Sequence, residues 1–350
     1  MHNEQFKSGF VAIMGRPNVG KSTILNALIG NKISIVSPIP QTTRHQIKGI
    51  LNMPGAQIVF VDTPGIHSFR DSLVTQLNTV ARQSVEGCDM ILYVADVSRA
   101  PGKEEYEIMK FLGTQKIKII MALNKMDLGQ RFLGEYVSAW KTRLEKKKIS
   151  NDPVISYLPL SARSGKNIDT LKSIILEHLP VQVPFYDTNT QTDFPLKFRV
   201  ADIVREKLFL NLKEELPHSL AVEVETIEKR NAPDKLAKEE DFVQDEDVEE
   251  DDIEEEGMED DFALSSLEQF KDSPKGGFMY IKVKIYVNRT SQKKIVIGEK
   301  GKLLKSIGTQ ARKEMETLFS RRVYLDVWVG VLSNWQDKPR ILKELGYSNT

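Results

Sequence analysis

The pattern of apolar positions predicts a sheet in the first half of the chain. Five apolar runs of strand length each lead into a helix-length amphipathic stretch or a loop, at residues 9–15, 56–62, 90–96, 116–124 and 154–161. Near-continuous apolar strands separated by helices predict a mostly parallel sheet that is covered on both faces. Only Pro54-Gly55 separates residues 45–53 from 56–62, so we expect these two segments to form an antiparallel hairpin at one side.

The second half has a different pattern. Residues 200–216 predict an amphipathic helix that Pro217 stops, and residues 218–229 alternate apolar and charged positions as a half-exposed strand does. Residues 278–289 alternate again, and we expect them to pair with that strand. A helix at 302–319, a strand at 321–331 and a short final helix complete the pattern.

The length and this change of pattern indicate two domains, because 350 residues are many for one ordinary domain. The first pattern ends near Pro180, and residues 183–195 predict an extended polar linker. We therefore expect domains at 1–182 and 196–345. The second would contain an acidic, disordered insertion at about 231–275.

The net charge of zero conceals a strong asymmetry between parts of the chain. Residues 234–261 hold 17 acidic and two basic residues, a formal charge of −15, so the rest of the chain carries +15. Residues 276–350 alone carry +9. A basic surface of this kind favours a polyanionic partner but does not choose between RNA, DNA and anionic lipid.

Other features exclude several classes of protein. Apolar residues make up 40% of the chain, which excludes a wholly disordered protein. No apolar run approaches the roughly 18–20 residues that span a bilayer, and the first residues lack the pattern of a secretion signal. Cys88 is the single cysteine, which fits a reducing cytoplasm.

Residues 15–22, Gly-Arg-Pro-Asn-Val-Gly-Lys-Ser, match a phosphate-binding loop between a predicted strand and a predicted helix. Main-chain N–H groups at such a helix N-terminus bind phosphate oxygens. Lys21 would lie on the β and γ phosphates, and the Ser22 hydroxyl would bind Mg²⁺. An ordinary glycine-rich turn is the alternative. The expected nucleotide contacts of this loop are Gly15, Arg16, Pro17, Asn18, Val19, Gly20, Lys21, Ser22 and Thr23.

A second motif follows the predicted strand at 56–62. In Asp62-Thr63-Pro64-Gly65 the aspartate can reach the metal, through water, and the Gly65 N–H can meet the γ-phosphate. Ile66 comes next.

Two further motifs complete a site for guanine. In Asn124-Lys125-Met126-Asp127 the Asp127 carboxylate can accept hydrogen bonds from guanine N1 and N2, which adenine cannot supply. Lys125 can lie along the base, and Asn124 can tie this motif to the phosphate loop. Ser161-Ala162 offers a main-chain N–H to guanine O6. Nucleotides bind at the C-terminal ends of strands in open α/β sheets, so the four motifs together predict a guanine-nucleotide-binding domain.

With these motifs, and with Pro-Ile-Pro-Gln-Thr-Thr-Arg at 38–44, the chain resembles the translation-factor-related GTPases and, within them, the Era family. The resemblance covers nearly the whole chain except the acidic insertion. It implies an α/β P-loop GTPase domain with one antiparallel strand, followed by an α+β type II KH domain. It also implies that Thr43, with Thr42 as the alternative, closes on Mg²⁺ and the γ-phosphate. The expected metal ligands are then Ser22, Thr43 and Asp62, and the expected catalytic residues are Lys21, Thr43 and Gly65.

Ile66 occupies the position of the water-orienting glutamine of Ras-like enzymes, and an isoleucine cannot orient a water. Some related GTPases instead bind K⁺ through an asparagine in the phosphate loop, and Asn18 stands at that position. We therefore hypothesise slow intrinsic hydrolysis that K⁺ stimulates through Asn18. The alternative is that Asn18 only stabilises the loop.

The basic second half contains Gly298-Glu299-Lys300-Gly301 before a helix. In KH domains such a G-x-x-G loop holds about four nucleotides by their backbone, whereas the bland alternative is a helix-entry turn. Its place between two predicted strands favours KH. The expected RNA contacts are Gly298, Lys300, Gly301, Lys302 and Lys305.

The resemblance also implies partners. GTP and GDP would bind the first domain, and 16S rRNA near its 3′ end would bind the second, in assembly of the small ribosomal subunit. It further implies a cytoplasmic protein, here expected as a monomer, with peripheral contact to the inner membrane. One rival is a nucleotide-gated RNA- or membrane-binding module with little physiological hydrolysis; another is a GTPase directed to tRNA or membranes.

The acidic insertion departs from the family pattern. It is either a solubilising extension or an RNA mimic that competes with phosphates for the neighbouring basic groove.

Overall fold

The structure is a computed structural model that describes residues 5–39, 44–66, 72–149, 151–230, 262–264 and 277–347. The chain forms two compact units, residues 1–196 with 334–350, and residues 197–333. Within the described part of the chain, no helix is both long and apolar enough to cross a membrane.

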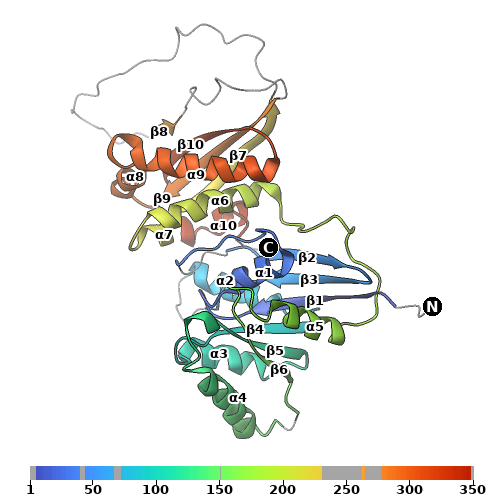
Figure 1. The fold of residues 1–350 in the computed structure, drawn as a ribbon. Helices are drawn as coiled ribbons and strands as arrows, with labels where there is room; N and C mark the ends of the chain where they lie inside the picture. The colour runs from blue at the N-terminus through green and yellow to red at the C-terminus, as the bar shows by residue number, and fades with distance from the viewer. Residues whose placement is uncertain are drawn as a thin grey trace, which may run out of the picture. The chain divides into compact units, whose positions relative to one another are not determined.

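The first unit is built on a six-stranded sheet in the order β2-β3-β1-β4-β5-β6 (Figure 1). Neighbouring strands are parallel except β2 and β3, which are antiparallel, as the Pro54-Gly55 turn predicted. Every residue of β3 and β4 is buried, which explains their unbroken apolar runs. The strands are β1 (Lys7–Met14), β2 (Ile47–Met53), β3 (Ala56–Asp62), β4 (Met90–Asp96), β5 (Lys118–Asn124) and β6 (Val154–Pro159).

Helices cover both faces of this sheet. On one face α1 contacts β2, β3 and α5. On the other, the segment around α2 joins α3 and α4 in one apolar cluster with alternate residues of β4. The helices are α1 (Lys21–Ile29), α2 (Ser72–Gln83), α3 (Lys103–Leu112), α4 (Leu133–Lys147) and α5 (Ile168–His178), with a 3₁₀ turn η1 (Met126–Leu128) after β5.

The segment expected as a linker, residues 183–195, lies against the first unit. The Ile50 N–H donates to the Gln191 carbonyl at 2.8 Å. The buried Gln57 side chain donates to the Tyr186 carbonyl at 2.8 Å and accepts from the Phe185 N–H at 2.7 Å. This segment is therefore hydrogen-bonded to β2 and β3.

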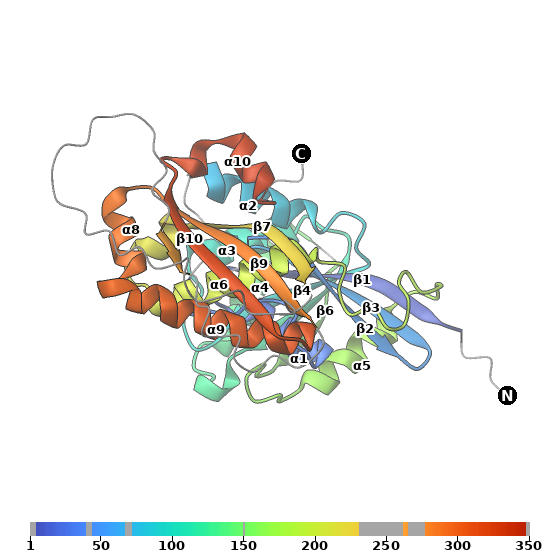
Figure 2. The ribbon, with the colours of Figure 1, turned by 90° about the horizontal axis from the view of Figure 1, so that it is seen from above.

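The second unit contains a four-stranded sheet in the order β7-β9-β10-β8, and Figure 2 shows β9 between β7 and β10. β9 and β10 are parallel, whereas β7 and β8 are antiparallel to their neighbours. A helix, the G-x-x-G loop and a second helix connect the parallel pair, as expected for a type II KH domain, so the predicted fold class is confirmed. The elements are α6 (Leu196–Asn211), α7 (Leu216–Ser219), β7 (Ala221–Arg230), β8 (Phe262–Leu264), β9 (Phe278–Val287), α8 (Thr290–Ile297), η3 (Glu299–Gly301), α9 (Lys302–Phe319) and β10 (Val323–Val331).

One predicted helix boundary is wrong. Helix α6 ends at Asn211, well before Pro217, and Glu214 then turns the chain with a φ of 57°. Pro217 instead lies in the first turn of α7, where a residue without an N–H donor is tolerated.

The C-terminal segment packs with the first unit. It consists of η4 (Trp335–Asp337), α10 (Pro339–Glu344) and the residues that follow, and it buries Trp335 and Tyr347. The Arg44 guanidinium lies 5.6 Å from the Trp335 ring centre and 5.4 Å from that of Tyr347. The expected second domain ran to residue 345, whereas the compact second unit ends at Ser333. The domain boundaries 1–182 and 196–345 stay a prediction.

Candidate functional site

The phosphate loop follows β1, and at Gly20 its main chain has a positive φ and lies close to Asn124, which a residue with a side chain would not allow. Gly20 has a φ of 98°, and a Cβ added there would lie 2.4 Å from Asn124 Nδ2. That amide group donates to the Val19 carbonyl at 2.8 Å. Asn124 therefore ties the base motif to the phosphate loop, as the sequence predicted.

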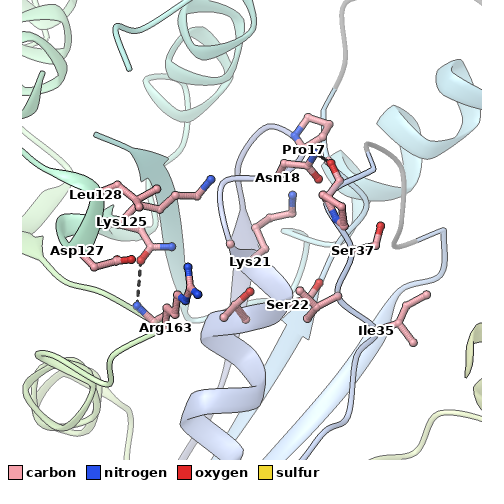
Figure 3. A pocket seen from close by; sticks show the side chains of 17 residues that line it. Pro17, Asn18, Lys21, Ser22, Ile35, Ser37, Lys125, Asp127, Leu128 and Arg163 are labelled. Carbon is pink, nitrogen blue, oxygen red and sulfur yellow. Dashed lines mark hydrogen bonds between the residues drawn. The ribbon is translucent and has the colours of Figure 1, made fainter. Parts of the chain in front are cut away.

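The Lys21 side chain points into the site from the start of α1 (Figure 3). Its ammonium group donates to the carbonyl oxygens of Gly15 at 3.1 Å and Arg16 at 3.0 Å. Burial lowers the pKa of Lys21 to about 8, although the Asp62 carboxylate opposes this shift. An anionic phosphate at this position would stabilise the charged form.

The expected metal ligands Ser22 and Asp62 lie together. Ser22 Oγ donates to Asp62 Oδ2 at 2.7 Å, and Ser34 Oγ donates to the same oxygen at 3.0 Å. Asp62 Oδ1 is buried without a hydrogen-bond donor, and burial raises the pKa of this carboxyl. A hydroxyl and an unsatisfied carboxylate oxygen fit Mg²⁺, which prefers oxygen ligands, bound directly or through water. The third expected ligand, Thr43, and its alternative Thr42 lie outside the described residues.

The residues expected to recognise guanine also lie together. Ser161 Oγ donates to Asp127 Oδ1 at 2.6 Å, which fixes the orientation of the carboxylate. The Ala162 N–H, expected to face guanine O6, donates to Asn124 Oδ1 at 3.0 Å. A guanine oxygen would share or replace that contact.

Many of the expected residues surround a pocket of about 630 Å³ (Figure 3). A Cβ on Gly65 would lie 2.6 Å from the Pro17 nitrogen, so this glycine allows close contact with the phosphate loop. Of the expected nucleotide contacts, those that line the pocket are Pro17, Asn18, Gly20, Lys21, Ser22, Thr23, Gly65, Asn124, Lys125, Asp127 and Ala162.

The other expected nucleotide contacts do not line the pocket. Thr63, for example, is fully buried and donates its hydroxyl to the Ile13 carbonyl at 2.9 Å. The Ile66 N–H donates to the Gly15 carbonyl at 3.3 Å, which holds the second motif against the phosphate loop. These contacts are Gly15, Arg16, Val19, Asp62, Thr63, Pro64, Ile66, Met126 and Ser161.

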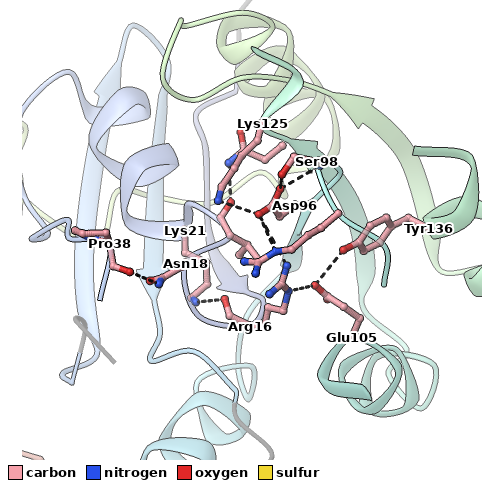
Figure 4. A network of polar contacts seen from close by, with 12 residues as sticks. Arg16, Asn18, Lys21, Pro38, Asp96, Ser98, Glu105, Lys125 and Tyr136 are labelled. Atoms are coloured by element: carbon pink, nitrogen blue, oxygen red, sulfur yellow. Dashed lines mark hydrogen bonds and ion pairs between the residues drawn. The ribbon is translucent and has the colours of Figure 1, made fainter. Parts of the chain in front are cut away.

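Sequence reasoning missed part of the pocket wall. Residues 35–38 line it, and so do Leu128 and Arg163. Leu128 and Arg163 directly follow Asp127 and Ala162, so their position next to these motifs could have predicted that they line the pocket. Asn18 reaches residues 35–38 through a 2.6 Å hydrogen bond from its Nδ2 to the Pro38 carbonyl (Figure 4).

The second unit presents the G-x-x-G loop between two helices. Gly298 ends α8 with a φ of 75°, and a Cβ there would lie 2.6 Å from Leu303 Cβ. Lys300, Lys302 and Lys305 are exposed on the loop and on the first turns of α9. The two glycines of this loop allow a nucleic-acid backbone to approach the main chain closely, and the exposed lysines beside them can contact its phosphates.

Comparison with known proteins connects both units to known families. Residues 10–125 match the family described as 50S ribosome-binding GTPase, and residues 270–336 match the KH domain. GTPase Era of Geobacter metallireducens is 36% identical over 99% of this chain and 100% of its own. GTPase Era of Thermotoga petrophila is 37% identical over 97% of each chain.

Two solved structures are similar over nearly the full length. One is Era in complex with MgGDPNP and nucleotides 1506–1542 of 16S ribosomal RNA, at 33% identity and a TM-score of 0.79, covering 98% of this chain and 99% of that one. The other is an Aquifex aeolicus Era variant bound to GDP·AlF4⁻, at 33% identity and a TM-score of 0.78, covering 98% and 100%. With residues of four guanine-nucleotide motifs around one pocket, a KH unit and full-length relatives of this identity, the chain belongs to the Era family of GTPases.

Proposed function

We propose that this GTPase binds 16S rRNA near its 3′ end through its KH unit and acts in assembly of the small ribosomal subunit. The observation that carries the proposal is the G-x-x-G loop with the exposed side chains of Lys300, Lys302 and Lys305 on it and directly after it. The similar Era structure that contains a 16S rRNA fragment supports the choice of RNA.

The nucleotide would occupy the pocket in the first unit. Lys21 and the Gly65 N–H would stabilise the transferring phosphoryl group, and Asp127 would select guanine. Ser22, Asp62 and Thr43 would hold Mg²⁺, which supplies positive charge to the phosphate oxygens. The buried Ile66 offers no side-chain base, so orientation of the attacking water would depend on groups outside this side chain.

We further propose that K⁺ stimulates hydrolysis through Asn18. Its Nδ2 is engaged with Pro38, so Oδ1 would be the ligand. The same hydrogen bond also suits the alternative, in which Asn18 only holds residues 35–38 near the phosphate loop. Hydrolysis rates in KCl and NaCl at matched ionic strength separate the two, because a purely structural Asn18 gives equal rates.

For location we propose a monomer in the cytoplasm with peripheral contact to the inner membrane. The basic charge outside the acidic insertion supports contact with anionic lipid. Sedimentation with anionic and with neutral vesicles tests this, since equal recovery with both would oppose an electrostatic contact.

A crosslinking experiment tests the identity of the RNA. A photoreactive residue at position 300 is expected to crosslink RNA of the 16S 3′ end in cells, and sequencing identifies the attached fragment. Recovery of tRNA, or of no RNA, would contradict the proposal.

Affinity measurements test the contact itself. Lys305→Ala should weaken binding of a labelled 16S 3′-end RNA and reduce the salt slope by about 0.7. Lys213→Ala, at an exposed lysine between α6 and α7 and outside the G-x-x-G loop and α9, serves as the matched control. Multiple-turnover GTP hydrolysis with and without this RNA then distinguishes a hydrolytic switch from a binding module with little turnover.

A further inference from the structure

A buried carboxylate that no motif contains contacts the phosphate loop. Glu105 lies in the first turn of α3, on the same stripe as the buried Ile108, Met109 and Leu112, and has no exposed surface. A carboxylate on an apolar stripe is costly to bury unless donors surround it. This position on the stripe is the signal by which the sequence could have revealed it.

Three donors satisfy Glu105. The Tyr93 hydroxyl donates at 2.7 Å and the Tyr136 hydroxyl at 3.3 Å. The third donor is Nε of Arg16, the second residue of the phosphate loop. Burial, with the neighbouring carboxylate, raises the pKa of Tyr93, so this hydroxyl keeps its proton and remains a donor.

A second buried carboxylate lies beside the base motif. Asp96, the last residue of β4, is 2% exposed. It accepts from the Lys125 ammonium at 2.9 Å, from Arg99 Nε at 3.2 Å and from the Ser98 hydroxyl at 2.6 Å. Burial alone would raise the pKa of Asp96, but the hydrogen bonds from Ser98 and Lys125 outweigh it and hold the pKa below its usual value.

Arg16 lies between the two carboxylates (Figure 4). Its Nε pairs with Glu105. Its Nη2 is buried without a hydrogen-bond partner and lies 3.9 Å from Asp96 Oδ2. The main-chain carbonyl of the same residue accepts a hydrogen bond from Lys21. A guanidinium can face two carboxylates at once, whereas a lysine ammonium is a single point charge.

The network thus ends at both halves of the nucleotide pocket. At one end Asp96 restrains Lys125, a side chain that would otherwise sample many rotamers before it could lie along a base. At the other end Glu105 restrains Arg16, whose carbonyl helps to place the Lys21 ammonium. Neither carboxylate lines the pocket itself.

We propose that Asp96, Glu105 and Arg16 form one positioning network that sets Lys125 for the base and Lys21 for the phosphates. Asp96 and Glu105 are positioning residues, because each acts through another side chain. The inference rests on the proposed nucleotide site. It predicts that a change at either carboxylate alters nucleotide affinity, and that the two effects depend on one another.

The first experiment tests the link from Asp96 to Lys125. GDP dissociation constants are measured for Asp96→Asn, Lys125→Ala and the double variant. Each single change should weaken binding at least about fivefold, and the double variant should bind no more weakly than the weaker single one. Fully additive effects would overturn this link. Asp152→Asn is the matched control, because Asp152 accepts hydrogen bonds from Trp140 and Tyr157 in the same unit but lies outside the pocket lining.

The second experiment tests the bridge through Arg16. Glu105→Gln and the charge-conserving Arg16→Lys are each placed in the native chain and in Asp96→Asn. In the native chain both should weaken GDP binding, because the released cation competes with Lys125 for Asp96. In Asp96→Asn the additional loss should be much smaller, and an equal loss in both backgrounds would overturn the bridge.

A gentler variant keeps the inference testable if Glu105→Gln does not fold. Ser98→Ala removes one donor to Asp96 without changing a charge, and thermal unfolding confirms that the variant is folded. It should weaken GDP binding in the native chain but not in Lys125→Ala. Weakening of equal size in both backgrounds would contradict the network.

If the unaltered chain binds no GDP, the proposed nucleotide site fails, whereas GDP binding that no network variant alters overturns only this inference.

Discussion

An ammonium group as deeply buried as that of Lys21 is costly to keep charged, and the Asp62 and Glu105 carboxylates offset this cost only in part. The pKa of about 8 is the result. Bound phosphates would raise this pKa, because they add negative charge within contact distance of the ammonium. Nucleotide binding and protonation of Lys21 should therefore be coupled.

This coupling predicts proton uptake on GDP binding. Below pH 8 Lys21 is already protonated, so uptake by this group should be small at pH 7 and large at pH 8.5, and affinity should decrease above pH 8. Calorimetry in two buffers of different protonation enthalpy measures the uptake. Lys172→Ala, a change on α5 outside the pocket lining, should leave it unaltered. The same small uptake at both pH values would show that Lys21 does not titrate in this range.

The nucleotide pocket could be predicted where its residues lie in contiguous motifs. Gly20, Lys21 and Asp127 belong to short patterns whose spacing itself reflects the ligand, and the structure brings them to one pocket. The place of Glu105 on an apolar stripe indicated its burial, but its partner could not be predicted, because Arg16 lies 89 positions away and neither residue type identifies the other. Such contacts depend on the strand order, which the local pattern leaves open.

At the scale of elements, two glycines of the second unit stand in different environments. Gly298 has a φ of 75°, and a Cβ there would clash with Leu303 at 2.6 Å. Gly308 lies inside α9, and a Cβ there would have open space around it. The first glycine shapes the loop, whereas the second only lowers helix propensity.

These environments predict opposite effects on stability. Gly298→Ala should lower the free energy of unfolding by about 1–3 kcal/mol and weaken RNA binding, because the loop must change shape. Gly308→Ala should raise that free energy by about 0.5–1 kcal/mol. Urea unfolding and RNA titration of both variants measure the effects. Equal stability changes would mean that the loop tolerates a side chain.

The elements themselves were easier to predict than their ends. β3 and β4 were evident because both faces are buried, and the hairpin because only a two-residue turn separates β2 from β3. The predicted end of α6 was wrong because proline occurs both after the end of a helix and in its first turn, and Pro217 lies in the first turn of α7. The attachment of residues 183–195 depends on the buried amide of Gln57, which the sequence alone did not reveal.

The acidic insertion gives a prediction for the second unit. Most of it lies outside the described residues. Residues 262–264, however, form β8, which pairs with β10, so the expectation of disorder is wrong for these residues. If the insertion mimics RNA, deletion of residues 238–261 should tighten RNA binding, most strongly at low salt. RNA titrations over a salt series measure this. Unchanged affinity throughout would leave the insertion as a solubilising extension.

At the scale of the whole molecule, the chain passes from the second unit back into the first through a very short segment. β10 ends at Val331, and the buried Trp335 begins η4 in the first unit. There the Arg44 guanidinium packs against the rings of Trp335 and Tyr347, and the His45 ring contacts the Leu345 carbonyl at 2.9 Å. Arg44 directly follows Thr43, the residue expected to close on the γ-phosphate. Strand β10 of the second unit is thus joined by a few residues to a segment that contacts Arg44, next to the residue expected to close on the γ-phosphate.

If this short connection transmits movement of β10 to the C-terminal segment, a longer and more flexible connection should weaken the effect of RNA on GTP hydrolysis. A Gly-Gly-Ser insertion between Ser333 and Asn334 leaves both units and the Arg44 contacts intact, since it adds chain without removing a side chain. Intrinsic GTP hydrolysis should therefore be unchanged, whereas the ratio of hydrolysis rates with and without 16S 3′-end RNA should decrease toward one. The same insertion after Gly257, within the acidic segment, is the control and should preserve the ratio of the unaltered chain. If the lengthened connection also preserves it, RNA acts on the nucleotide site by another route.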